Sequence, residues 1–167
     1  MRKAPNMAIE APVSKYKKTN LKIYIAVCIG LVIWCVYDGY FNEKFKEKYT
    51  DPDGKAKGWL VVNRSAPPYL IGAAVLLSVY LFAIRNKKIV ADENELIIPS
   101  TLLRTGSGKE NIPYEAIQKI DKTYFDKKGF FIITYSHKNG SEVNRKLSDR
   151  KYDNLAAILD HLVAKIT

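Results

Sequence analysis

The chain has 167 residues, of which 47% are hydrophobic, and it carries a formal net charge of +10. Its two cysteines do not form a disulfide framework, and the spacing of its two cysteines and two histidines does not suggest a zinc site. The charge is uneven: residues 1–22 carry +5, residues 23–84 carry +1 and residues 85–167 carry +4. The basic excess therefore flanks a nearly neutral middle segment.

Residues 1–22 are polar and basic, and Pro5 and Pro12 interrupt them. This composition predicts a solvated N-terminal arm, or a docking strip that becomes ordered when a partner binds. No small-residue cleavage site follows the first apolar run, so we do not expect the run to be a cleaved signal peptide.

The first apolar run, from Ile23 to Tyr37, contains 15 residues without a charge. It reaches a membrane-spanning length over residues 23–41 if Asp38 to Phe41 form an interfacial end. The two cysteines, Cys28 and Cys35, lie seven residues apart in this run. On one helix they are too far apart to form a disulfide, and we expect them to pack as small apolar side chains.

The second apolar run, residues 66–84, has 19 uncharged residues and would extend ~28 Å as a helix, close to the thickness of a bilayer core. Pro67 and Pro68 suit its first turn. Neither run shows the polar face of a soluble core helix, so we predict a transmembrane hairpin over 23–84 with an outer loop over 42–65. Ala74 and Ser78 form a small-xxx-small pair, a candidate site for helix packing.

Two spans place both chain ends on one side of the membrane. Seven cations lie near the membrane there and are candidate contacts for lipid headgroups: Lys15, Lys17, Lys18, Lys22, Arg85, Lys87 and Lys88. The outer loop holds six cations, so the positive-inside rule favours cytoplasmic termini by a small margin. We expect an integral protein of a bacterial inner membrane, with its soluble domain in the cytoplasm.

After Arg85 the pattern changes to short strands separated by turns. Asn139-Gly140 is the clearest hairpin signal, and Asp126–Gly129 is a second one. A Pro and a single helical turn are expected within residues 111–117. Six strands are predicted, near residues 89–91, 95–98, 101–104, 118–124, 130–135 and 142–147.

A final amphipathic helix is predicted after a cap at Ser148 or Asp149. Its apolar positions recur at spacings of three and four residues, from Tyr152 to Ile166, as expected for a helix that covers a sheet. A helix lying on the membrane surface is the alternative, although the polar face is not especially basic. The fold class is thus an α+β membrane protein, with residues 85–167 as a small antiparallel β domain.

The segments IVADENELIIPSTLLRT, IPYEAIQKIDK, GFFIITYS, NGSEVNRKL and YDNLAAILDHL together resemble the bacterial pleckstrin-homology-like (PH-like) domains. The resemblance covers roughly residues 88–166. It implies a strongly bent antiparallel sheet of seven strands, closed at one end by the C-terminal helix, beside a pair of transmembrane helices. The six strands predicted from the residues are one fewer than the family has.

Chemical motifs are few. His137 and His161 are expected at the surface or at the rim of the core. The Gly106–Lys109 stretch lacks the first glycine and the Ser or Thr of a phosphate-binding loop. Asp38 would indicate a proton path in mid-membrane, but its place at the end of the first run favours an interfacial position. We predict no catalytic residue, no metal and no cofactor.

The sequence therefore favours a non-enzymatic membrane-anchored interaction protein, an accessory or scaffold subunit of a larger membrane complex. The alternative is a module that binds anionic lipid surfaces, alone or as a homo-oligomer. An enzyme or transporter is a third, weaker hypothesis. Acidic residues alternate with the basic ones and no nucleic-acid motif is present, so nucleic acid is not an expected partner, and neither is a small-molecule substrate.

Overall fold

A computed structural model describes residues 8–99, 108–137 and 140–166. The chain divides into two compact units. One is the helical unit, Lys18–Ile84, and the other, here called the β unit, combines the N-terminal residues through Lys17 with Arg85–Thr167. The predicted strand at 101–104 and the Asn139 hairpin position lie outside the described residues.

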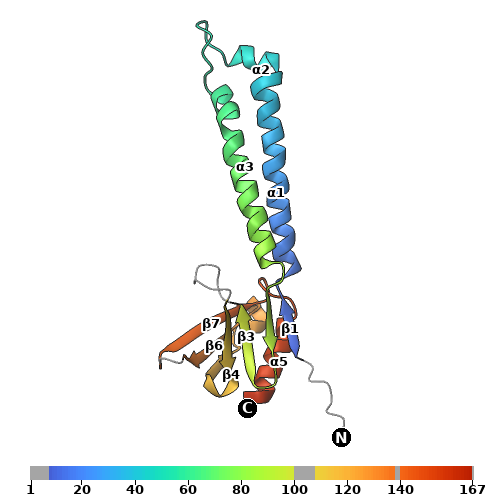
Figure 1. The fold of residues 1–167 in the computed structure, drawn as a ribbon, viewed down its shortest axis with the longest axis vertical. Coiled ribbons are helices and arrows are strands. Elements are labelled where there is room, and N and C mark those ends of the chain that lie inside the picture. The colour runs from blue at the N-terminus through green and yellow to red at the C-terminus, as the bar shows by residue number, and fades with distance from the viewer. Residues whose placement is uncertain (1–7, 100–107, 138–139, 167) are drawn as a thin grey trace. The chain divides into compact units, whose positions relative to one another are not determined.

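Two long helices form the helical unit, and they run side by side in opposite directions (Figure 1). Helix α1 spans Lys15–Val36, continues into a short π-helix η1 over Tyr37–Phe41, and is followed by α2, Glu43–Lys48. Helix α3 spans Trp59–Ile84. Both long helices are long and apolar enough to cross a membrane, and only 6% and 11% of their most apolar windows are buried.

The inner seam of the helical unit follows a spacing of three and four residues. In the middle of α1, residues 22–35, the half-buried positions are Ile25, Cys28, Val32 and Cys35, which is the repeat expected where two helices face each other. The cysteines are thus free thiols on the seam. Most other apolar side chains point outward, and Leu76 is 72% exposed. An apolar exterior of this kind suits a hydrocarbon environment.

The turn end of the helical unit is held by polar contacts. Asp38 accepts hydrogen bonds from the Trp34 indole at 2.6 Å and from the Asn42 amide at 2.9 Å. The Arg64 guanidinium donates to the Gly39 carbonyl at 3.1 Å. Asp38 therefore lies in η1 at the end of α1 with two donors, as the interfacial hypothesis requires.

Helix α3 begins earlier than predicted. The expected boundary at residue 66 is wrong, because the helix already starts at Trp59 and contains Pro67 and Pro68 in its interior. A proline removes one backbone donor, so the carbonyls of Asn63 and Arg64 lose their usual partners in the helix. The prolines thus mark an interior position of the helix, and the outer loop is correspondingly shorter.

Two antiparallel sheets form the β unit (Figure 1). The first has the order β1-β2-β3-β4 and the second the order β5-β6-β7. The bounds of the strands are Ile9–Pro12 (β1), Lys88–Ala91 (β2), Glu95–Pro99 (β3), Lys109–Pro113 (β4), Ile117–Asp121 (β5), Phe130–Ser136 (β6) and Glu142–Ser148 (β7). The shorter helical elements are η2, Tyr114–Ala116, and α4, Phe125–Lys128.

Residues Ile9–Pro12 of the predicted N-terminal arm form a strand of the β unit, which the sequence did not predict. Strand β1 pairs antiparallel with β2, from Ile9 opposite Ala91 to Pro12 opposite Lys88. The side chain of Ala11, on β1, is fully buried. The division into a separate arm over 1–22 is therefore wrong, since the helical unit is inserted between the first two strands of one sheet. Pro12 is tolerated because β1 is an edge strand.

The core of the β unit lies between the sheets and the C-terminal helix α5, Leu155–Ile166. Ile158 and Leu162 from α5 are fully buried, as are Phe131 and Ile133 from β6. This confirms a C-terminal helix that covers a sheet. The helix starts later than predicted, because Asn154 adopts a left-handed φ of 60° and a turn occupies the residues after Ser148.

Candidate functional site

The predicted lipid contacts fall at the two places where the chain passes between the β unit and the helices. Lys15, Lys17, Lys18 and Lys22 lie in the first turns of α1, and Arg85, Lys87 and Lys88 follow α3. The ammonium group of Lys88 pairs with Glu10 across the β1–β2 ladder, so one of the seven charges is partly compensated within the sheet. Three of the seven are half-buried and four are exposed. The half-buried ones are Lys17, Lys18 and Lys87, and the exposed ones are Lys15, Lys22, Arg85 and Lys88.

The start of α1 is tied to the C-terminal part of the β unit. Ser14 N–H donates to the Lys151 carbonyl at 2.9 Å, and Lys15 N–H donates to Asp153 Oδ2 at 3.0 Å. The carboxylate of Asp153 thus caps the first turn of the helix from a distant part of the chain. These contacts join Ser14 and Lys15 to the residues after β7 within the β unit.

Ala74 and Ser78 line an apolar groove between the two long helices. The groove has a volume of about 440 Å³, and α1 contributes Ile25, Ile29, Val32 and Ile33 to it. The Ser78 hydroxyl donates to the Ala74 carbonyl at 2.8 Å, so the serine needs no partner from outside. The two small side chains leave the backbone of α3 accessible at this point, which is the geometry that close helix packing requires.

A cleft of about 940 Å³, lined by both polar and apolar residues, lies along β4 and the end of β6. Its carboxylate, Glu110, accepts a hydrogen bond from the Tyr135 hydroxyl and lies 3.5 Å from the Arg145 guanidinium. These partners satisfy the Glu110 charge within the fold. Among the described residues, no group of three or more His, Cys, Asp or Glu side chains could hold a metal ion.

Comparison of the chain with protein-family models, with curated proteins and with solved structures finds no match. The functional argument below therefore uses the chain's own residues.

A second polar cluster joins α5, η2 and the turn between β2 and β3. The Tyr114 hydroxyl donates to the Asp92 carbonyl at 2.6 Å, and His161 Nε2 lies 3.4 Å from the same oxygen. Burial, followed by the negative charges of Asp92 and Glu95, raises the pKa of Tyr114 to about 12. His161 lies at the rim of the core, as the sequence predicts.

The raised pKa of Tyr114 predicts alkaline destabilisation of the β unit. An unfolded tyrosine ionises near pH 10, so the stabilising contribution is complete below that pH and is lost as the pH rises towards 12. Tyr114→Phe should lower the stability of the β unit at neutral pH by about 1 kcal/mol and flatten this alkaline loss. Amide exchange at Leu96 and Ile98 from pH 8 to 11, corrected for the intrinsic rate, measures both effects. If the stability of the β unit falls equally steeply with pH in the wild type and in Tyr114→Phe, Tyr114 is not the group responsible for the alkaline loss.

Two aromatic side chains and two lysines meet in a cluster that the sequence did not predict as a group. Tyr124 and Phe130 stack with ring centroids 5.4 Å apart and an interplanar angle of 20°. Lys128 Nζ lies 5.0 Å from the Tyr124 ring centroid, and Lys146 Nζ lies 3.5 Å from that of Phe130. The lysines and aromatics come from different strands and loops, so the sequence pattern alone does not show that they meet.

Proposed function

We propose that this protein is a non-enzymatic membrane-anchored interaction protein, an accessory or scaffold subunit of a larger integral membrane complex. The observation that carries the proposal is the apolar groove at Ala74 and Ser78. A groove of this kind on an otherwise apolar helical hairpin offers packing surface to a further transmembrane helix, and small residues permit close backbone approach.

The pairing of β1 with β2 supports the membrane part of the proposal. These strands directly precede α1 and follow α3, and they belong to one sheet. Both ends of the hairpin must therefore lie on the same side of any membrane that it crosses, which requires an even number of spans. Two spans of suitable length and hydropathy meet this requirement.

The proposal includes a PH-like β unit on the cytoplasmic side of a bacterial inner membrane. Strand β1 brings the number of described strands to seven, in sheets of four and three, followed by the closing helix α5. The number of described strands supports the PH-like part of the proposal, and one of them, β1, lies outside residues 88–166, to which the resemblance was assigned. The cations at the ends of α1 and α3 favour the cytoplasmic side for the β unit.

Filling the groove tests the proposal. Ala74→Leu together with Ser78→Leu should displace a packed partner helix and reduce the co-purified partner by roughly tenfold or more in mild detergent. Ala26→Leu is the matched control, because Ala26 is exposed on α1 and lies outside the groove lining. If wild-type protein extracted gently from its native membrane carries no stoichiometric partner, the subunit proposal is wrong.

The basic residues that flank the helices favour a second candidate function, binding of anionic lipid surfaces. A lysine near an anionic leaflet contributes about 1 kcal/mol, and the effect is screened by salt. The full chain in nanodiscs should then enrich anionic over neutral lipids in its annulus at low salt. An annulus of unchanged composition at low salt would exclude this function.

A further inference from the structure

We propose that the turn around α4 is a second membrane contact, in which Tyr124 and the lysines around it bind the anionic phospholipid headgroups of the leaflet next to the β unit. The site comprises Tyr124, Phe130, Lys128 and Lys146, with Lys122 and Lys127 beside them. This inference rests on the proposed anchoring of the chain in a membrane. It adds a site distinct from the seven cations at the helix ends.

The stacked pair is held so that one ring stays accessible. Phe125, the next residue along the chain, turns into the core and packs edge-to-face on Phe131, with ring centroids 5.8 Å apart. Its neighbour Tyr124 is consequently left 42% exposed. A tyrosine with an accessible ring and hydroxyl is suited to the headgroup level of a bilayer.

The backbone at the end of α4 is tied to the residue that follows β7. Gly129 has a left-handed φ of 65°, and a Cβ atom there would lie 2.0 Å from Asp149 Oδ2. The Asp149 N–H also donates to the Gly129 carbonyl at 2.9 Å. These contacts bring the backbone that carries Lys127 and Lys128 next to the end of β7, the strand that carries Lys146.

The local charge is positive after the nearby acids are counted. Across residues 119–129 and 146–151 there are seven Lys or Arg and three Asp side chains. Of these acids, Asp121 accepts from the Thr123 N–H at 3.0 Å, and bonds from the Thr123 side chain and backbone lower its pKa. The lowered pKa keeps Asp121 charged, and Asp126 and Asp149 are the other two acids counted. The surplus of cations matches an anionic leaflet.

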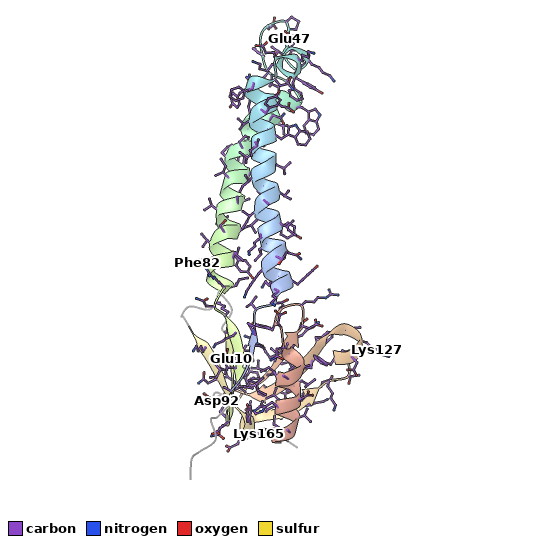
Figure 2. All side chains as sticks on the ribbon, turned by 90° about the vertical axis from the view of Figure 1, so that its right-hand side faces the viewer. Glu10, Glu47, Phe82, Asp92, Lys127 and Lys165 are labelled. Carbon is purple, nitrogen blue, oxygen red and sulfur yellow. The ribbon has the colours of Figure 1, made fainter. Side chains whose placement is uncertain are left out.

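Hydrogen bonds within the β unit connect the α4 turn with Ser14, which directly precedes α1 in the chain. The Asp149 N–H donates to the Gly129 carbonyl. Two residues further along the chain, the Lys151 carbonyl accepts a hydrogen bond from the Ser14 N–H. Asp149 and Arg150 line a shallow surface pocket with Ser14 and Tyr16. Tyr16 and Tyr124 are the large apolar side chains that are exposed on the described part of the β unit. Figure 2 shows Lys127 at the outer edge of this unit, on the side away from Asp92.

Hydrogen–deuterium exchange of the full chain in nanodiscs tests the site. Peptides covering residues 121–130 should exchange more slowly in nanodiscs with phosphatidylglycerol than in purely neutral ones. Lys128→Ser with Lys146→Ser should remove this difference, a change of about tenfold in protection. Lys109→Ser with Lys165→Ser removes the same charge from exposed positions on β4 and α5. This control variant should keep the difference in exchange between the two kinds of nanodisc. Tyr124→Ser should reduce the difference in part.

The outcomes separate this inference from the proposed anchoring. A chain that does not incorporate into nanodiscs contradicts the membrane anchor itself. A chain that incorporates, but whose residues 121–130 exchange equally in both lipid compositions, overturns the α4 site alone. Equal losses in the two double-lysine variants would also overturn it, because they would show an effect of net charge and not of this site.

Discussion

Replacement of Ala11 by aspartate should unfold the first sheet of the β unit. Ala11 is fully buried on β1 opposite Ile89, and no described cation lies among the core residues around it. An unpaired buried carboxylate costs more than about 3 kcal/mol, a large part of the stability of a small domain. Amide exchange at Ile89–Ala91 and Leu96–Ile98 should accelerate towards the unfolded rate, because both strands depend on the β1 edge.

Glu10→Ala provides the control for this variant. Glu10 is exposed on the same strand, and its ion pair with Lys88 is solvent-accessible, so its loss should cost at most about 1 kcal/mol. If Ala11→Asp leaves exchange in β2 and β3 unchanged, β1 is not a structural strand of this sheet and the insertion of the helical unit is wrong.

The second large effect is expected at Phe131. It is the largest fully buried side chain in the described core, opposite Leu147 on β7 and in edge contact with Phe125. Phe131→Ala removes these contacts and leaves a cavity, which costs about 3–5 kcal/mol. Denaturant titration followed by exchange in β6 should show a correspondingly lower midpoint.

Phe130→Ala is the matched control, since the same side chain is truncated one position along on the other face of β6. Phe130 is only half-buried, so its truncation should cost about 1 kcal/mol. A similar cost at the two positions would mean that Phe131 does not face the core.

Local patterns allowed much of the fold to be predicted. The run Phe130–Tyr135 is apolar on both faces and forms the central strand β6, and the spacing of Leu155, Leu159 and Leu162 identifies the core face of α5. The two charge-free runs correspond to the two long helices. These signals depend on side chains within one element, so they are visible without tertiary information.

The remaining features depend on contacts between distant segments. The alternation of Ile9 and Ala11 with Glu10 and Pro12 is too short, and contains a proline, so it did not predict a strand. These residues form β1 by pairing with β2, although the whole helical unit separates the two strands in sequence. The start of α3 at Trp59 was not predicted, because the polar residues Asn63 and Arg64 and the two prolines indicated a loop. The helix contains all four residues in its interior. The cluster at Tyr124 arises only when β6 and β7 align.

Side-specific cysteine labelling tests the central claim most directly, namely that a membrane hairpin is inserted between β1 and β2. In a Cys28→Ala, Cys35→Ala background, single cysteines replace Glu10, Asp53 and Glu93, which are all exposed. With a membrane-impermeant maleimide, positions 10 and 93 should react from one side and position 53 from the other. Reaction of positions 53 and 93 from the same side would contradict the two spans, and reaction of positions 10 and 93 from opposite sides would contradict the β1–β2 pairing.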